Sequence, residues 1–141
     1  MRITARRLNS EYLFEAKGES GVPVLMDNTD SVTVKGASPM EMLLMGVAGC
    51  NAIDIIMILK NQKLEVEDYT VEVIVNTVPL ATSTKLESMV LKIDVLGDIP
   101  EKNLVRAASL SFEKYCSVAL TLRESVEITY SLHLNGKEIA H

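Results

Sequence analysis

The amino-acid sequence predicts an α+β fold, with mostly antiparallel strands around a long buried central helix. Residues 42–59 are apolar on almost every side, which is typical of a helix covered by other elements. Several other segments alternate in the manner of strands, and no glycine-rich phosphate loop joins a strand to a helix. We expect a single domain over residues 1–141, because a chain of this length can enclose one core.

Three short strands are expected before the central helix. Residues 12–17 point alternately to opposite faces, and the glycine-containing turn at 18–21 allows residues 22–26 to return as the next strand. Residues 3–8 precede both, so the three segments predict a meander. A polar loop over residues 27–37 then leads to the helix.

The start of the central helix is marked by a capping box. Ser38 is a favourable N-cap, Pro39 suits the first helical position, and Glu41 follows Ser38 by three residues. Lys60 lies near the predicted end, where a cation suits the helix dipole. We therefore expect a helix over residues 39–61.

Two strands and a second helix are expected after the central helix. Residues 69–75 and 89–95 alternate in the strand pattern and are joined by a polar loop. Asp98 is expected to cap the next helix, with Pro100 in its first turn. The inner face of that helix is predicted to be formed by Leu104, Ala108, Phe112 and Tyr115.

The chain ends in a further strand pattern. Residues 126–134 alternate, and Asn135-Gly136 is a signal for a tight turn. The predicted order is therefore three strands, a helix, two strands, a helix and a strand.

Composition excludes some classes of function. The net charge of −5 and a pI of about 5.0 disfavour nucleic acid as a partner, which requires a basic surface. Residues 42–59 have the minimum length of a membrane span, but Asn51 and Asp54 near their centre favour a soluble protein with no membrane contact. The first residues lack the apolar stretch of a secretory signal, so we expect a cytoplasmic protein with reduced thiols.

The two cysteines are the candidate functional residues. Cys50 lies in the middle of the central helix, within SPMEMLLMGVAGCNAIDIIMILK, and Cys116 lies at the end of the second helix, within KYCSVALTL. A free cysteine often packs as a small apolar residue, and this reading stays open for each of them. Together, the two motifs resemble those of the OsmC family, which includes osmotically inducible protein C and the organic hydroperoxide resistance proteins. The likeness is greatest to the shorter OsmC-like branch.

The resemblance implies an OsmC-like fold and an intertwined homodimer with thiol sites where the subunits meet. It also implies thiol-dependent reduction of organic hydroperoxides in oxidative stress defence. Cys50 would be the peroxidatic thiol and Cys116 the resolving thiol, and a dithiol reductant would restore the pair. No cofactor is expected.

The sequence departs from the peroxidase members at one position. Those members have a glutamate directly after the proline, whereas here Met40 follows Pro39 and the glutamate is Glu41. Glu41 precedes Cys50 by nine residues and so points away from the cysteine face of a straight helix, which favours capping. The alternative function is therefore a non-enzymatic OsmC-like protein that binds a small apolar or thiol-reactive ligand at the dimer interface.

The charged groups that would act on the thiols are less defined. Arg6 and Arg7 are the candidates for the cation that activates the first cysteine in peroxidase members, and solvated surface arginines are the alternative. Asp54 follows Cys50 by one turn on the same face, where a carboxylate disfavours a thiolate, and a structural role is favoured for it. No cysteine or histidine cluster has zinc-site spacing, so we expect no metal site. The sequence leaves open the substrate, the reductant and the activating arginine.

Overall fold

The structure is a computed structural model that describes all of residues 1–141. The chain forms two compact units, residues 1–45 and residues 46–141. The predicted α+β class and the predicted order of elements are confirmed, with additional short elements near the C-terminus. That the whole chain acts as one OsmC-like domain stays a prediction.

The first unit is the expected meander. Strands β1 (Thr4–Arg7), β2 (Phe14–Lys17) and β3 (Pro23–Met26) pair antiparallel in chain order. Only Leu13 and Asp27 are buried in this unit. Three short strands do not enclose a core by themselves, so several apolar side chains of the sheet are exposed.

The polar loop after β3 is organised by the buried carboxylate of Asp27. One of its oxygens accepts the Ser31 hydroxyl at 2.6 Å and the Asn28 N–H, and the other accepts the Lys35 N–H. The Ser31 and Lys35 hydrogen bonds favour the charged form and lower the pKa of Asp27. The carboxylate therefore fixes the loop that leads to the central helix.

Helix α1 (Pro39–Asn61) begins with the predicted capping box. The N–H of Glu41 donates to the Ser38 hydroxyl at 3.3 Å, and the N–H of Ser38 donates to the Glu41 carboxylate at 2.7 Å. These bonds lower the pKa of Glu41. The capping role of Glu41 is confirmed.

Helix α1 buries a single stripe along its length. The buried residues recur every fourth position: Val47, Asn51, Ile55 and Leu59. On other sides of the helix, Ile53 is 61% exposed and Met57 is 56% exposed. Within one chain the helix is covered less completely than the apolar pattern predicts, because these side chains are open to solvent. That a second copy covers them stays a prediction.

The second unit contains a four-stranded sheet in the order β4 (Asp68–Pro79), β5 (Thr84–Leu96), β6 (Glu127–Leu134) and β7 (Lys137–Ile139). Strands β4 and β5 form a long antiparallel hairpin, whereas β5 and β6 pair in parallel. A parallel pair needs a crossover, and the helical segment between β5 and β6 supplies it. The remaining strand pairs are antiparallel, as the sequence predicts.

The predicted turn at Asn135-Gly136 joins β6 to β7. Both residues have positive φ, 51° and 83°, the signature of a type I′ hairpin. The Asn135 side chain also exchanges two hydrogen bonds with Gly97 at 2.9 and 3.0 Å. These bonds tie the hairpin to the end of β5.

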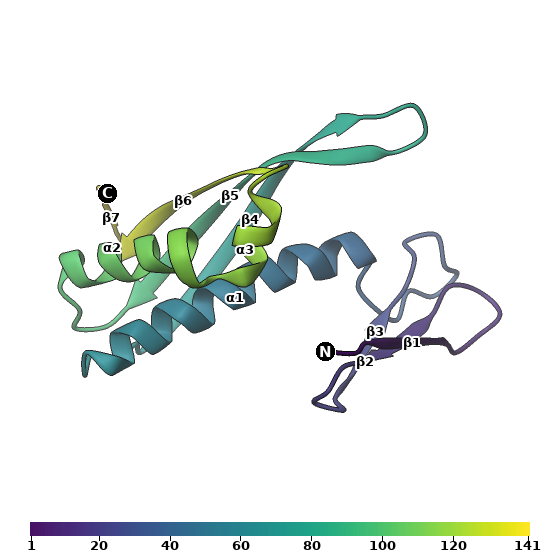
Figure 1. Cartoon of the computed structure of the whole chain (residues 1–141), viewed down its shortest axis with the longest axis horizontal. Helices are drawn as coiled ribbons and strands as arrows, with labels where there is room; N and C mark the ends of the chain where they lie inside the picture. The colour runs from purple at the N-terminus through teal and green to yellow at the C-terminus, as the bar shows by residue number, and fades with distance from the viewer. The chain divides into compact units, whose positions relative to one another are not determined.

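The crossover segment consists of three helical pieces in place of one predicted helix. Helix α2 (Glu101–Leu110) continues into a π-helical turn, η1 (Ser111–Tyr115), and α3 (Ser117–Leu122) follows a break at residue 116. Figure 1 shows this segment running alongside α1. The apolar side of β5 is fully buried in this unit, as are Leu104 and Ala108 of α2.

Two details of the second helix differ from the prediction. Asp98 does not cap α2: the N-cap is Pro100, which has no side chain that can accept a hydrogen bond, and its carbonyl accepts the N–H of Asn103. Tyr115 was predicted on the inner face but is 50% exposed. The π-helical turn changes the rotation per residue, so the face extrapolated from α2 fails after Phe112.

Candidate thiol site

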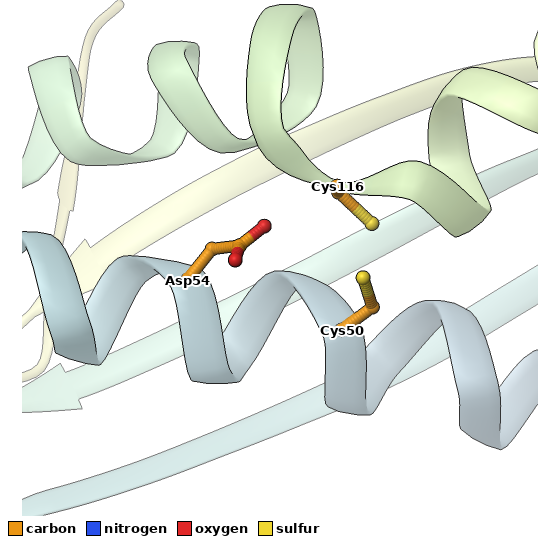
Figure 2. Close-up of side chains that lie close together, drawn as sticks. All are labelled: Cys50, Asp54 and Cys116. Carbon is orange, nitrogen blue, oxygen red and sulfur yellow. The ribbon is translucent and has the colours of Figure 1, made fainter.

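The two cysteines meet in the second unit, together with Asp54. Cys50 and Asp54 lie one turn apart on α1, and Cys116 lies at the break between η1 and α3. The two sulfur atoms and a carboxylate oxygen of Asp54 all lie within 4.8 Å of one another. Figure 2 shows the sulfur atoms facing each other across the space between the two segments. The expected approach of the two thiols is confirmed, and both thiols are free.

Cys116 has no solvent exposure. Burial, together with the neighbouring Cys50 thiol, raises its pKa from 9.0 to about 12, although the N–H of Ala119 opposes this effect. That N–H donates to the Cys116 sulfur at 3.3 Å. The expectation that Cys116 lies only at a helix C-terminus is therefore incomplete, because the residue is also the N-cap of α3.

Cys50 is partly exposed, unlike Cys116. The glycines near it, Gly46 and Gly49, have open space where a Cβ would lie, with no atom within 4 Å. In a single chain, these glycines are therefore not needed for close packing. They leave the backbone beside Cys50 uncovered, which suits access of a small molecule to this thiol.

A buried polar network supports the site. The Ser111 hydroxyl lies 2.9 Å from the Asn51 amide oxygen and 3.3 Å from an Asp54 carboxylate oxygen. Its single proton is shared between these two acceptors. The Asn51 amide nitrogen donates to the carbonyl of Val47 at 3.0 Å. Sequence reasoning missed Ser111 because no pattern signals a π-helical turn, which places its hydroxyl against α1.

Asp54 has no cationic partner. None of the ion pairs of the chain includes it, and its hydrogen-bond donor is the Ser111 hydroxyl. In the first unit, the Arg7 guanidinium donates to the carbonyls of Ser10 and Glu11 and so fixes the loop between β1 and β2. Arg6 is exposed and forms no ion pair. Activation of Cys50 by an arginine stays a prediction.

The first unit contains a cavity of about 440 Å³. Its lining combines aromatic and apolar side chains with the polar residues that start the loop after β3: Tyr12, Phe14, Met26, Asp27, Asn28, Thr29, Ser38 and Pro39. None of the thiol-site residues lines it. The cavity has the size and the mixed polarity for a small molecule, but it contains neither of the two thiols.

The fold agrees with the comparisons to known proteins. A model of the OsmC-like protein family matches residues 30–131, and the chain belongs to this family. Protein YhfA of Escherichia coli K12 is 39% identical over 126 residues, which cover 84% of this chain and 87% of YhfA. A hypothetical protein from Aquifex aeolicus VF5 has a crystal structure that is 28% identical, with a TM-score of 0.78 over 95% of this chain and 96% of that one.

The likeness extends to a structure named for organic hydroperoxide resistance. The OsmC protein of Legionella pneumophila has a TM-score of 0.69 at 16% identity, over 94% of this chain and 97% of that one. At this identity the likeness shows the shared fold alone.

The length and composition of α1 would suffice for a membrane span. The core helix of a soluble protein meets the same criteria, and α1 carries a stripe of fully buried residues.

Proposed function

We propose that this protein reduces organic hydroperoxides, with Cys50 as the peroxidatic thiol and Cys116 as the resolving thiol. The observation that carries the proposal is the pair of free thiols whose sulfur atoms lie within 4.8 Å, although the residues are distant in sequence. Membership of the OsmC-like family supports a role in peroxide-related stress defence. The name of the Legionella pneumophila protein points to the same class of substrate.

The chemistry needs only the two thiols and an external reductant. The Cys50 thiolate attacks the terminal oxygen of the hydroperoxide, the O–O bond breaks and Cys50 becomes a sulfenic acid, while the leaving alkoxide takes up one proton from solvent and becomes the alcohol. Cys116 then attacks the Cys50 sulfur, and the sulfenic hydroxyl leaves as water with the Cys116 proton. A dithiol reductant returns the resulting disulfide to two thiols by exchange.

The surroundings of each sulfur support the proposed roles. A disulfide needs a sulfur–sulfur distance of about 2.05 Å, so the two side chains must close a gap of at most a few ångströms. Cys116 is fully buried and its raised pKa leaves it protonated, which disfavours it as the first attacker. Cys50 is partly exposed and suits the first attack.

One observation favours the alternative, a non-enzymatic protein that binds a small apolar or thiol-reactive ligand. The glutamate expected beside Pro39 is replaced by Met40, and Glu41 is engaged in the cap of α1. In addition, no cation forms an ion pair with the thiol-site carboxylate. A thiol pair without these charged groups could capture an electrophile without catalytic turnover.

We also propose that the protein is a cytoplasmic homodimer and that the second copy covers the exposed apolar face of α1. Ile53 and Met57 present large apolar side chains to solvent on this helix. Light scattering at micromolar concentration should give twice the mass of one chain, and Ile53→Glu should shift the protein to monomer. A wild-type monomer under these conditions would refute the dimer.

The peroxidase proposal is tested by consumption of an organic hydroperoxide with a dithiol reductant in excess. Wild type should turn over and Cys50→Ser should be inactive. Cys116→Ser should form no disulfide within the chain and turn over more slowly, because only the external thiol can then reduce the Cys50 sulfenic acid. If wild type binds or reacts once without turnover, the binding function is supported. Equal turnover by wild type and Cys50→Ser would refute the assigned chemistry.

A further inference from the structure

The thiol site also has the composition of a metal site. Two cysteine sulfurs and one carboxylate oxygen converge from α1 and from the break before α3, within 4.8 Å of one another. Figure 2 shows the three side chains extending into the same space. Zinc is bound by sulfur at about 2.3 Å and by carboxylate oxygen at about 2.0–2.2 Å, which places tetrahedral ligand atoms roughly 3.5–3.8 Å apart. Small side-chain rotations would bring the three atoms to that spacing.

The surroundings of Asp54 are compatible with a bound cation. Asp54 is partly buried, carries no ion pair, and receives its hydrogen bond from a neutral hydroxyl. A carboxylate that is removed from water is normally paired with a cation or bound to a metal, and the partly buried Asp54 has the position for such a partner. Ser111 and Asn51 form the kind of outer hydrogen-bond layer that orients a ligating carboxylate.

We propose that, when the two thiols are reduced, Cys50, Asp54 and Cys116 bind one thiophilic divalent metal ion, Zn²⁺ in particular. Two sulfur ligands disfavour Mg²⁺ and Ca²⁺, which prefer oxygen, whereas a site with both sulfur and carboxylate ligands suits Zn²⁺. Three protein ligands leave the fourth tetrahedral position for water or a small ligand. The spacing of the residues in the sequence did not predict this site.

Metal binding and disulfide formation exclude each other, because both use the same two sulfur atoms. Oxidation of the loaded pair by a hydroperoxide would consume two protons and give the disulfide, an alcohol, water and the free Zn²⁺ ion. Only this consequence for turnover rests on the proposed peroxidase activity. The binding itself requires only the reduced protein, and the metal would protect the thiols from oxidants.

The test measures Zn²⁺ binding to reduced protein under anaerobic conditions, in competition with a chromophoric chelator. We expect one Zn²⁺ per chain in wild type, with affinity lost in Cys50→Ser and Cys116→Ser. Asp54→Asn should weaken binding about tenfold or more. Asp98→Asn is the matched control, because Asp98 is exposed and forms no ion pair, and it should bind as wild type does.

A second measurement keeps the test independent of folding defects in the variants and of the peroxidase proposal. Wild type oxidised with diamide, which needs no hydroperoxide, should lose Zn²⁺ binding and regain it after reduction. Cd²⁺ should give thiolate charge-transfer absorption with the reduced protein alone. The proposal is overturned if reduced wild type does not bind Zn²⁺, if the oxidised form binds equally well, or if a folded Asp54→Asn variant keeps full affinity. A protein that binds Zn²⁺ but consumes no hydroperoxide would refute only the proposed function.

Discussion

Alkylation of the two thiols provides a quantitative test of their assigned roles. The pKa of Cys116 is raised from 9.0 to about 12 by burial and by the Cys50 thiol. A difference of three units means that, near pH 8, the thiolate fraction of Cys116 is about a thousandfold lower than that of an ordinary cysteine. Because this sulfur also has no solvent exposure, access lowers its reactivity further.

The assay is labelling with iodoacetamide, followed by peptide mapping, with a metal chelator in the buffer. In native wild type, Cys50 should be labelled while Cys116 stays unlabelled. In urea the two cysteines should react at similar rates, which controls for the intrinsic reactivity of their peptides. Labelling of Cys116 in the Cys50→Ser variant should remain far slower than labelling of Cys50 in the Cys116→Ser variant.

Equal native rates, or faster labelling of Cys116, would refute this reasoning. Such a result would mean that the Ala119 N–H stabilises the Cys116 thiolate more than burial disfavours it. Cys116 would then be the better first attacker, and the two roles in the proposed cycle would be reversed.

Four further predictions follow from the same contacts. Because the pKa of Cys116 is higher in the folded state, the contribution of this thiol to stability is complete below pH 9 and is lost as the pH rises toward 12. Over this window the free energy of unfolding of wild type, measured by urea unfolding, should therefore fall more steeply than that of Cys116→Ala. The expected difference in slope is about 1.4 kcal/mol per pH unit. Ser111→Ala should destabilise by about 1–3 kcal/mol in urea unfolding, because the buried Asn51 oxygen loses its donor, whereas Ser125→Ala at an exposed position should have little effect. Ser38→Ala should lower the free energy of unfolding by about 1 kcal/mol through loss of the α1 cap. Since the pKa of Glu41 is lowered in the folded state, the stability that its carboxylate contributes should be present above the usual pKa of 4.5 and lost as the pH falls through the folded pKa. A Glu41→Gln variant with the same acid stability profile as wild type would contradict this role of Glu41. Asp54→Asn should speed alkylation of Cys50, because a carboxylate oxygen within 4.8 Å repels the developing negative charge on the sulfur. Slower alkylation would indicate a structural role alone.

The elements that could be predicted from the sequence are those with local signals. Ser38, Pro39 and Glu41 form a capping box that depends only on neighbouring residues, and the structure contains it. Asn135-Gly136 likewise forms the expected tight turn, because both residues tolerate positive φ. The meander before α1 was predicted by alternation and by its turn.

The features that could not be predicted depend on tertiary packing. The π-helical turn at Ser111–Tyr115 has no sequence pattern, yet it places the Ser111 hydroxyl against α1 and ends the helix at Cys116. The parallel pairing of β5 with β6 depends on how the crossover packs. The pairing of Cys50 with Cys116 was expected from the family resemblance, but the position of the Asp54 carboxylate beside both sulfur atoms arises only in the fold. This is why spacing alone gave no indication of a metal site.

The measurement that tests the central claim most directly is titration of the reduced, metal-free protein with an organic hydroperoxide. The products would be identified by mass spectrometry of non-reduced peptides. The account predicts that one equivalent per chain yields one disulfide between Cys50 and Cys116 and one equivalent of the alcohol, and that a dithiol reductant restores both thiols. Recovery of unreacted hydroperoxide with both thiols intact, or a disulfide that joins Cys50 of one chain to Cys50 of another, would contradict it.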